Sequence, residues 1–105
     1  MTRETEVLWL DEHRVISLHE LVEFSGLREE ELLDLANAGA LPSMSAPGGG
    51  IAFSASVVTV ARTACRLRDE LELDVHGIGV ALRLLERVRD LEGEIARLRA
   101  LLPRV

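Results

Sequence analysis

The chain has few aromatic residues and contains neither tyrosine nor lysine. Aromatic residues make up 3% of its 105 residues, whereas hydrophobic residues make up 48%. A core built from this composition must consist of Leu, Val, Ile and Ala side chains, a mixture that favours helices. The lack of aromatic side chains between the basic ones also argues against a protein that stacks single-stranded bases.

Cysteine and long apolar runs are equally scarce. The single cysteine, Cys65, excludes an intramolecular disulfide framework and is typical of a reducing compartment. No apolar run reaches the length of about 18 residues that a membrane span needs, so we expect no membrane association. Residues 1–6 lack the basic region and apolar segment of a signal peptide. We therefore expect a cytoplasmic protein.

The negative charge is distributed unevenly. The formal net charge is −6, and residues 1–40 hold ten acids against Arg3, Arg14 and Arg28, a net of −7. Residues 41–105 hold nine Arg and eight acids, a net of +1. An acidic half of this kind repels a phosphate backbone and attracts a basic partner.

Residues 17–38 have the pattern of a helix-turn-helix. Ser17 and Glu20 have the spacing of a capping box at the start of the first helix. A tight turn at residues 25–27 leads to the second helix, which we expect to end at Gly39 as a left-handed cap before Pro42. Apolar residues on one face of each helix are expected to be buried: Leu18, Leu21, Val22 and Leu27 in the first, and Leu32, Leu35 and Ala36 in the second.

The flanking segments predict short strands and a wing. Residues 7–10 and 15–16 are short apolar runs typical of strands or of an extended lead-in. Residues 43–50 are expected to form the tip of a β-hairpin between residues 40–41 and 51–53. The glycine triplet at 48–50 lacks the Lys-Ser/Thr pair of a phosphate-binding loop. A third helix is expected from a cap at Ser54 or Ser56 to about Leu71.

The last helix carries a heptad pattern. Asp74 is the expected N-cap, and apolar residues then recur at alternating spacings of three and four up to Pro103: Ala81, Leu84, Val88, Leu91, Ile95, Leu98 and Leu102. One projecting helix cannot bury such a stripe alone. We therefore expect a homodimer, formed through Leu84, Val88, Leu91, Ile95, Leu98 and Leu102.

The sequence offers no candidate for catalysis or metal binding. His13, His19 and His76 have no spacing that places two ligands on one helix face, and surface or capping roles suit them better. Cys65 lies on the apolar stripe of the third helix, where a buried and unreactive thiol is expected. No nucleophile elbow or dinucleotide-binding glycine pattern occurs. We therefore expect no enzyme activity, catalytic residue, cofactor or metal.

The second helix opens with an acidic run, which is the candidate partner-binding site: Glu29, Glu30, Glu31 and Asp34. A DNA-reading helix would place basic and amide side chains here. The helix dipole favours acids in the first turn by about 0.3–1 kcal/mol each, which does not explain Asp34. The run is therefore either a solvated face or a surface for a basic protein, with Glu30 at its centre. The basic residues of the third helix are expected to form local salt bridges: Arg62, Arg66 and Arg68.

Residues 13–102 resemble a MerR-type winged helix-turn-helix and, more narrowly, the chaperone-modulator family CbpM. The resemblance rests on residues 25–32, 66–74 and 77–82 and on Phe53. It implies a mainly α fold with a small β-hairpin wing and a long C-terminal coiled-coil helix. The expected organisation is an extended or flexible segment at 1–12, a winged helix-turn-helix domain at 13–73 and a dimerisation helix at 74–105.

The resemblance also implies a function. Such modulators are dimers that bind the J-domain of a DnaJ-like or CbpA-like co-chaperone, which presents a basic helix, and prevent it from engaging Hsp70. The acidic helix would be complementary to that surface. The alternative is a MerR-type DNA-binding transcriptional regulator, which requires basic residues on the second helix and the wing. A purely structural dimer element is a third hypothesis.

Overall fold

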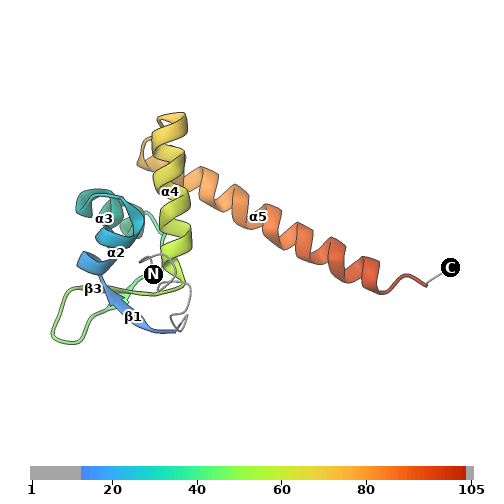
Figure 1. The fold of residues 1–105 in the computed structure, drawn as a ribbon, viewed down its shortest axis with the longest axis horizontal. Helices are drawn as coiled ribbons and strands as arrows, with labels where there is room; N and C mark the ends of the chain where they lie inside the picture. Colours follow the sequence, from blue (N-terminus) through green and yellow to red (C-terminus); the bar gives the residue numbers. More distant parts are fainter. Residues whose placement is uncertain (1–12, 104–105) are drawn as a thin grey trace, which may run out of the picture.

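The computed structural model describes residues 13–103, which form a small head from which one long helix projects (Figure 1). The elements in chain order are β1 (Val15–Ser17), α2 (Leu18–Ser25), α3 (Glu29–Asn37), β2 (Met44–Ser45), β3 (Ile51–Ser54), α4 (Val57–Leu71) and α5 (Val75–Ala100). The molecule measures 57 × 30 × 29 Å along its principal axes. The predicted mainly helical fold with a small β-sheet is confirmed.

Two of the helices begin at the predicted capping residues. At α2, the Ser17 hydroxyl oxygen accepts a hydrogen bond from the Glu20 backbone N–H at 3.0 Å, and the Glu20 carboxylate accepts one from the Ser17 N–H at 3.0 Å. At α5, the Asp74 carboxylate accepts a hydrogen bond from the Gly77 N–H at 2.8 Å. Each cap satisfies backbone donors that a helix start otherwise leaves unpaired.

A glycine closes the turn between α2 and α3. Gly26 has a φ of 83°, and its N–H donates to the Val22 carbonyl oxygen at 3.3 Å. A Cβ atom added to Gly26 would lie only 3.1 Å from the Cys65 Sγ atom on α4. The turn therefore needs glycine for two reasons, its left-handed backbone and its close approach to α4.

The sheet is antiparallel with the strand order β1-β3-β2. β3 is central, pairing Phe53 with Ile16 of β1 and Ala52 with Met44 of β2. The predicted hairpin is confirmed, but its expected limits are wrong: residues 44–45 form a strand, and the tip is only residues 46–50. Residues 40–41 form no strand because their N–H groups donate to the Leu35 carbonyl oxygen, closing α3. The apolar run at 7–10 lies outside the described residues.

The core is aliphatic except for Phe53 and lies between α2, α3, α4, the start of α5 and the sheet. The largest fully buried side chains are Phe53, Ile16, Leu21, Leu27, Leu32, Leu35, Leu41, Ile78 and Val58. On α4, burial of Val57 and Val58 compensates for the low helix propensity of β-branched residues. Ser56 occupies the N-cap position of α4, as predicted, but its side chain accepts no capping hydrogen bond. The predicted position of the cap is therefore correct, and the predicted hydrogen bond is absent.

The long helix α5 leaves the head after its first two turns. Ile78 and Leu82 are buried against the head, whereas every residue from 83 to 100 is exposed. The helix ends at Ala100. Leu102, the last residue of the predicted heptad stripe, therefore lies beyond the helix, and its inclusion in the stripe was wrong. Among the described residues, no helix is long and apolar enough to cross a membrane.

Replacing Gly26 with alanine tests the turn. We expect Gly26→Ala to lower the free energy of unfolding by more than the roughly 1 kcal/mol that a left-handed alanine costs, because its Cβ also meets Cys65. Gly39→Ala is the matched control, since Gly39 has a φ of 78° and nothing within 4 Å of an added Cβ. Urea unfolding measures both variants. Equal losses would show that the Cys65 contact costs nothing.

Candidate functional site

The exposed side of α3 carries an acidic surface with an apolar centre. Glu29, Glu30 and Asp34 are exposed, and Leu33 between them is half-buried. Together with Arg28 and Asn37 they line a shallow hollow of about 570 Å³. We call these six residues the acidic face. Its composition, one apolar side chain within a charged rim, makes it the candidate partner-binding site.

The apolar centre of the acidic face was missed in the sequence. Leu32 and Leu35 are fully buried, as predicted. At about 100° per residue, Leu33 points about 100° away from Leu32 and about 160° away from Leu35, so it lies off the face that those two leucines bury. The signal was therefore present in the sequence, because the spacing of Leu33 from both Leu32 and Leu35 places it at the edge of the core.

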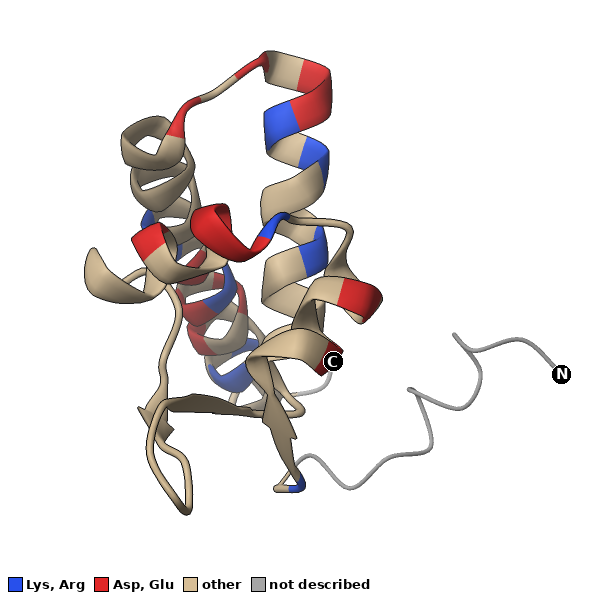
Figure 2. Cartoon of the chain, turned by 90° about the vertical axis from the view of Figure 1, so that its left-hand side faces the viewer, with Lys and Arg blue, Asp and Glu red and all other residues tan. Residues whose placement is uncertain are grey.

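The carboxylates of the acidic face are unneutralised within residues 13–103. No ion pair joins Glu29, Glu30 or Asp34 to a basic residue in this part of the chain. Figure 2 shows acidic residues gathered at the start of α3 and basic residues on the neighbouring helix α4. Arg28 directly precedes the acids in the sequence. The positive end of the α3 dipole stabilises acids of the first turn. Their charge remains available to a partner.

Glu31, the fourth predicted contact residue, does not belong to this surface. The residue is only 8% exposed. Its carboxylate accepts a hydrogen bond from the Arg28 backbone N–H at 2.9 Å and a second one from the Arg68 guanidinium on α4. The expectation that all four acids face a partner is corrected here, because Glu31 is used inside the chain to cap α3 and tie it to α4. Its position three residues after the N-cap is the capping-box spacing.

The surroundings of Glu31 lower the pKa of its carboxyl group. Burial raises the pKa of the Glu31 carboxyl, but the Arg28 N–H and the Arg68 guanidinium together lower it by more, so its pKa lies below the ordinary value of 4.5. Arg68 also donates to the Asp69 carboxylate at 2.9 Å, which lowers the pKa of Asp69. Burial raises the pKa of the neighbouring Cys65 thiol, so it is protonated at neutral pH.

The basic residues of α4 make local contacts. Arg68 forms the pairs described above, and Arg66 lies 3.8 Å from the Glu70 carboxylate. Arg62 donates instead to the Phe24 backbone carbonyl at 2.9 Å, which ties α4 to the end of α2. Local salt bridging is confirmed for Arg66 and Arg68, whereas Arg62 binds a backbone oxygen.

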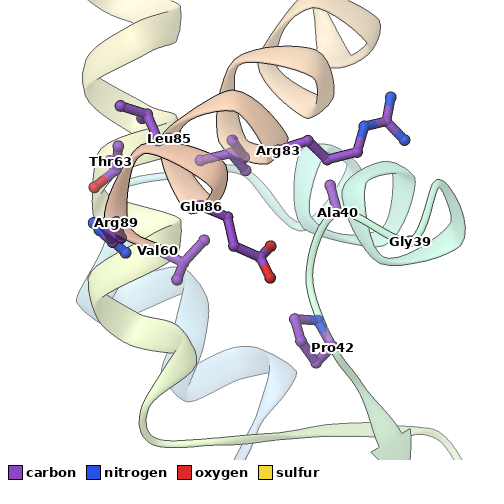
Figure 3. Close-up of a pocket in the computed structure, with 10 residues that line it drawn as sticks. Gly39, Ala40, Pro42, Val60, Thr63, Arg83, Leu85, Glu86 and Arg89 are labelled. Atoms are coloured by element: carbon purple, nitrogen blue, oxygen red, sulfur yellow. The ribbon is translucent and has the colours of Figure 1, made fainter. Parts of the chain in front are cut away.

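A second hollow lies where α5 leaves the head. It has a volume of about 270 Å³ between the segment after α3, α4 and α5, and Figure 3 shows Glu86 extending toward Val60 and Pro42. Its lining mixes Ala40, Pro42, Val60 and Leu82 with charged side chains of α5. Among residues 13–103, no group of three or more His, Cys, Asp or Glu is arranged to hold a metal ion.

The heptad residues of α5 are exposed along the projecting part of the helix. The exposed fractions are 62% for Leu84, 49% for Val88, 41% for Leu91, 49% for Ile95 and 53% for Leu98. Leu102, beyond the helix end, is 65% exposed. Scattered apolar residues on a surface are ordinary, but a continuous apolar row at helical spacing marks an interaction surface. We call Ala81, Leu84, Val88, Leu91, Ile95 and Leu98 the seam.

Comparison with known proteins supports the resemblance seen in the sequence. Residues 16–100 match the family described as MerR HTH family regulatory protein. The chaperone modulatory protein CbpM of Salmonella arizonae is 39% identical over 62 residues, which cover 59% of this chain and 61% of that protein. The proteins of the same name from Salmonella paratyphi B and Salmonella newport match to the same extent. The chain thus spans less than two thirds of the length of these relatives.

Glu31→Gln tests the internal role of this carboxylate. We expect the variant to lose about 1–3 kcal/mol of unfolding free energy near neutral pH, because a hydrogen-bonded charge is removed beside Arg68. The folded-state pKa of Glu31 is lowered, so its contribution is present above the unfolded value of 4.5 and is lost as the pH falls through the folded value. The stability difference between the two proteins should therefore shrink in acid.

The matched control is Glu30→Gln, the same chemical change on the exposed side of α3. It should alter stability by no more than about 0.5 kcal/mol at any pH. Denaturant unfolding at several pH values measures both variants. A loss for Glu31→Gln that does not depend on pH would show that the charge of Glu31 contributes nothing.

Proposed function

The chain belongs to the MerR HTH family of regulatory proteins, and from that premise we propose that it is a non-enzymatic modulator of a co-chaperone in the cytoplasm. It binds the J-domain of a DnaJ-like or CbpA-like protein through the acidic face and thereby keeps the J-domain from engaging Hsp70. The names of the relatives, chaperone modulatory proteins, support the general role. The J-domain contact is the part that we propose.

The observation that carries the proposal is the set of unpaired acids around Leu33. Glu29, Glu30 and Asp34 have no ion-pair partner within residues 13–103. A basic helix laid along α3 would pair with these carboxylates, and its apolar side chains would cover Leu33. Charge complementarity speeds the encounter and fixes orientation, whereas the buried apolar centre slows dissociation.

The geometry behind α3 suits this role. Glu31 holds the start of the helix against α4, and Leu32 and Leu35 hold its inner side in the core. The exposed carboxylates thus project from a helix that is fixed at its start and along its length. A preorganised surface loses less conformational entropy on binding, which favours affinity.

The DNA-binding alternative finds no support in these surfaces. Its reading helix would be α3, whose first turn holds Glu29 and Glu30, and these would face phosphates. The wing from residue 40 to residue 53 contains no charged residue. Most non-specific DNA affinity comes from basic side chains that displace counterions. The helix-turn-helix is therefore a scaffold for binding a protein.

We also propose that two copies of the chain associate through the seam. The core side chains of the head are buried within one chain, but the seam residues from Leu84 to Leu98 are exposed. Burial of one Leu or Ile side chain contributes about 1.5–3 kcal/mol. The free energy gained by burying several such residues on each helix exceeds the ordinary free-energy cost of association.

Glu30→Lys tests the docking surface. We expect the affinity for the cognate J-domain to fall by at least about tenfold, because attraction to a basic helix becomes repulsion. Isothermal titration calorimetry with the purified J-domain measures the change. The fold should be preserved, since Glu30 is exposed and makes no ion pair within the described residues.

Asp90→Lys is the matched control, because it makes the same charge reversal on the exposed part of α5, away from α3. Its affinity for the J-domain should remain close to that of the unaltered chain. If Glu30→Lys, Glu29→Lys and Asp34→Lys all bound as well as Asp90→Lys, the J-domain would dock on another surface.

The double replacement Leu91→Asp and Ile95→Asp tests the association. We expect sedimentation velocity to show monomers, because two carboxylates per chain would have to be desolvated in the seam. Gly93→Asp with Ala96→Asp is the control, since these exposed residues lie on the opposite side of the same helix. The control should remain dimeric. A monomeric unaltered chain at micromolar concentration would contradict the dimer.

A further inference from the structure

The sheet of the head has an open edge along β1. β1 pairs with β3 on one side, and within residues 13–103 no strand lies on its other side. The unpaired backbone N–H and C=O groups of an edge strand form a template to which a further strand can be added. The outer edge of β1 is therefore a place where an extended segment can dock.

Val15 carries the unused backbone groups of this edge. The Ala55 N–H donates to the Arg14 carbonyl oxygen at 2.7 Å, so the backbone groups of Arg14 point toward β3. Because successive residues of an antiparallel strand alternate in this respect, the N–H and C=O groups of Val15 point away from β3. Those of Ser17 also point away, but its N–H already donates to the Glu20 carboxylate at 3.0 Å. Val15 is thus the residue of β1 to which a new strand can bond.

The side chain of Val15 is also open to a new neighbour. Ile16 is fully buried under the helices of the head, and successive side chains of a strand point to opposite sides of the sheet. Val15 therefore points to the side of the sheet that faces away from these helices, and it is 49% exposed. In Figure 1, α2 and α3 lie above the strands. An apolar side chain opposite Val15 on an added strand would cover it.

Residues 7–10, Val-Leu-Trp-Leu, are the segment of this chain that suits the edge. They are consecutive apolar residues, and Val and Trp are common in strands. Only residues 11–14, Asp-Glu-His-Arg, separate them from β1, and His13 lies in a turn. Four-residue loops are frequent in β-hairpins. Such a short connection also gives the segment a high effective concentration at the edge.

A loop of residues 11–14 sets the register of the added strand. It places Leu10 opposite Val15 and Trp9 opposite Ile16. Leu10 and Val15 then exchange two backbone hydrogen bonds, because the backbone groups of Val15 point to this edge. Leu10 covers the exposed side chain of Val15, and Trp9 lies beside Ile16 at the margin of the core.

We propose that residues 7–10 dock on the open edge of β1 as a fourth strand of the sheet, antiparallel to β1 and within the same chain. The inference goes beyond the proposed function and does not depend on it, because β1 belongs neither to the acidic face nor to the seam. An edge that is paired in this way is closed to strands of other molecules.

Hydrogen exchange at the Val15 amide tests the docking. We expect this amide to exchange at least about tenfold more slowly in the unaltered chain than in Leu10→Pro, which cannot donate to the Val15 carbonyl oxygen. Leu10→Val keeps the N–H group and should protect Val15 as the unaltered chain does. The Ile16 amide faces β3 and should be protected in all three proteins. Equal exchange of Val15 in all three, measured by NMR, would overturn the proposal.

The fluorescence of Trp9 tests the same pairing from the other strand. Trp9 is the single tryptophan of the chain, which contains no tyrosine. Val15→Pro removes the N–H that points away from β3, so the β1–β3 bonds remain, and proline is tolerated at such edge positions. We expect its Trp9 emission to shift to longer wavelength and acrylamide quenching to increase. Val15→Thr keeps the N–H group and is the matched control, which should behave as the unaltered chain does.

Two readouts keep this test decisive. Far-UV circular dichroism shows whether Val15→Pro retains the folded head. If it does not, the unaltered chain is compared with the same chain unfolded in urea. Acrylamide quenching of Trp9 that is equal in the folded and the unfolded chain would overturn the proposal.

The source of the added strand is tested in the double variant Leu91→Asp and Ile95→Asp. A segment from the same chain should protect the Val15 amide as well in this variant as in the unaltered chain, and dilution should not change the protection. Protection lost in the variant or on dilution would show that a second copy supplies the strand, and would overturn the hairpin. Sedimentation reports the association through the seam separately, so a failure of the hairpin and a failure of the dimer are distinguishable.

Discussion

The arrangement of the acidic face depends on the contact between Glu31 and Arg68. This contact joins the start of α3 to the last turn of α4 and occupies the one carboxylate of the acidic run that points inward. With Glu31 on the inner side, helical periodicity leaves Glu29, Glu30 and Asp34 on the outer side. One acid of the run therefore fixes the helix, and its neighbours are free to meet a partner.

The fold and the surface charge of α3 indicate different kinds of binding partner. The helix-turn-helix and hairpin place α3 where a nucleic-acid reader would hold its recognition helix, yet three of the four exposed residues of that helix are acidic. The same scaffold therefore presents a surface that repels phosphates and attracts basic side chains. Membership of the MerR HTH family gives the shape, and the side chains of α3 decide what that shape can bind.

Much of the fold could be predicted because strong local signals coincide with the buried faces. The capping serine and aspartate at residues 17 and 74 satisfy backbone groups that any helix start exposes, so their role follows from sequence alone. The hairpin limits could not be predicted, because a two-residue strand such as Met44–Ser45 carries no readable alternation. The hydroxyl of Ser56 accepts no capping hydrogen bond, although serine is common at this position.

The candidate site was predicted only in part: the acidic run was recognised, but the directions of its individual side chains were not. Composition identified the acidic run as a unit, but a run of four acids on a helix cannot face one direction. The inward position of Glu31 was not predicted, although its spacing to the N-cap carries that signal, and neither was the apolar centre at Leu33, although its spacing from Leu32 and Leu35 does. The ion pair with Arg68 was not predictable, since it joins residues 37 positions apart whose approach depends on the tertiary fold.

Because so much of α5 is exposed, the stability of its helical structure depends on whether the chain associates with a second molecule. Residues 83–100 are all exposed, and helices in proteins owe most of their stability to packing. In a single chain the outer turns have little to hold them, whereas the head has its own core. By mass action, their helix content should then rise with the concentration of the chain, and so should their resistance to proteases. The helix content of the projecting part of α5 would thus depend on the concentration of the protein itself.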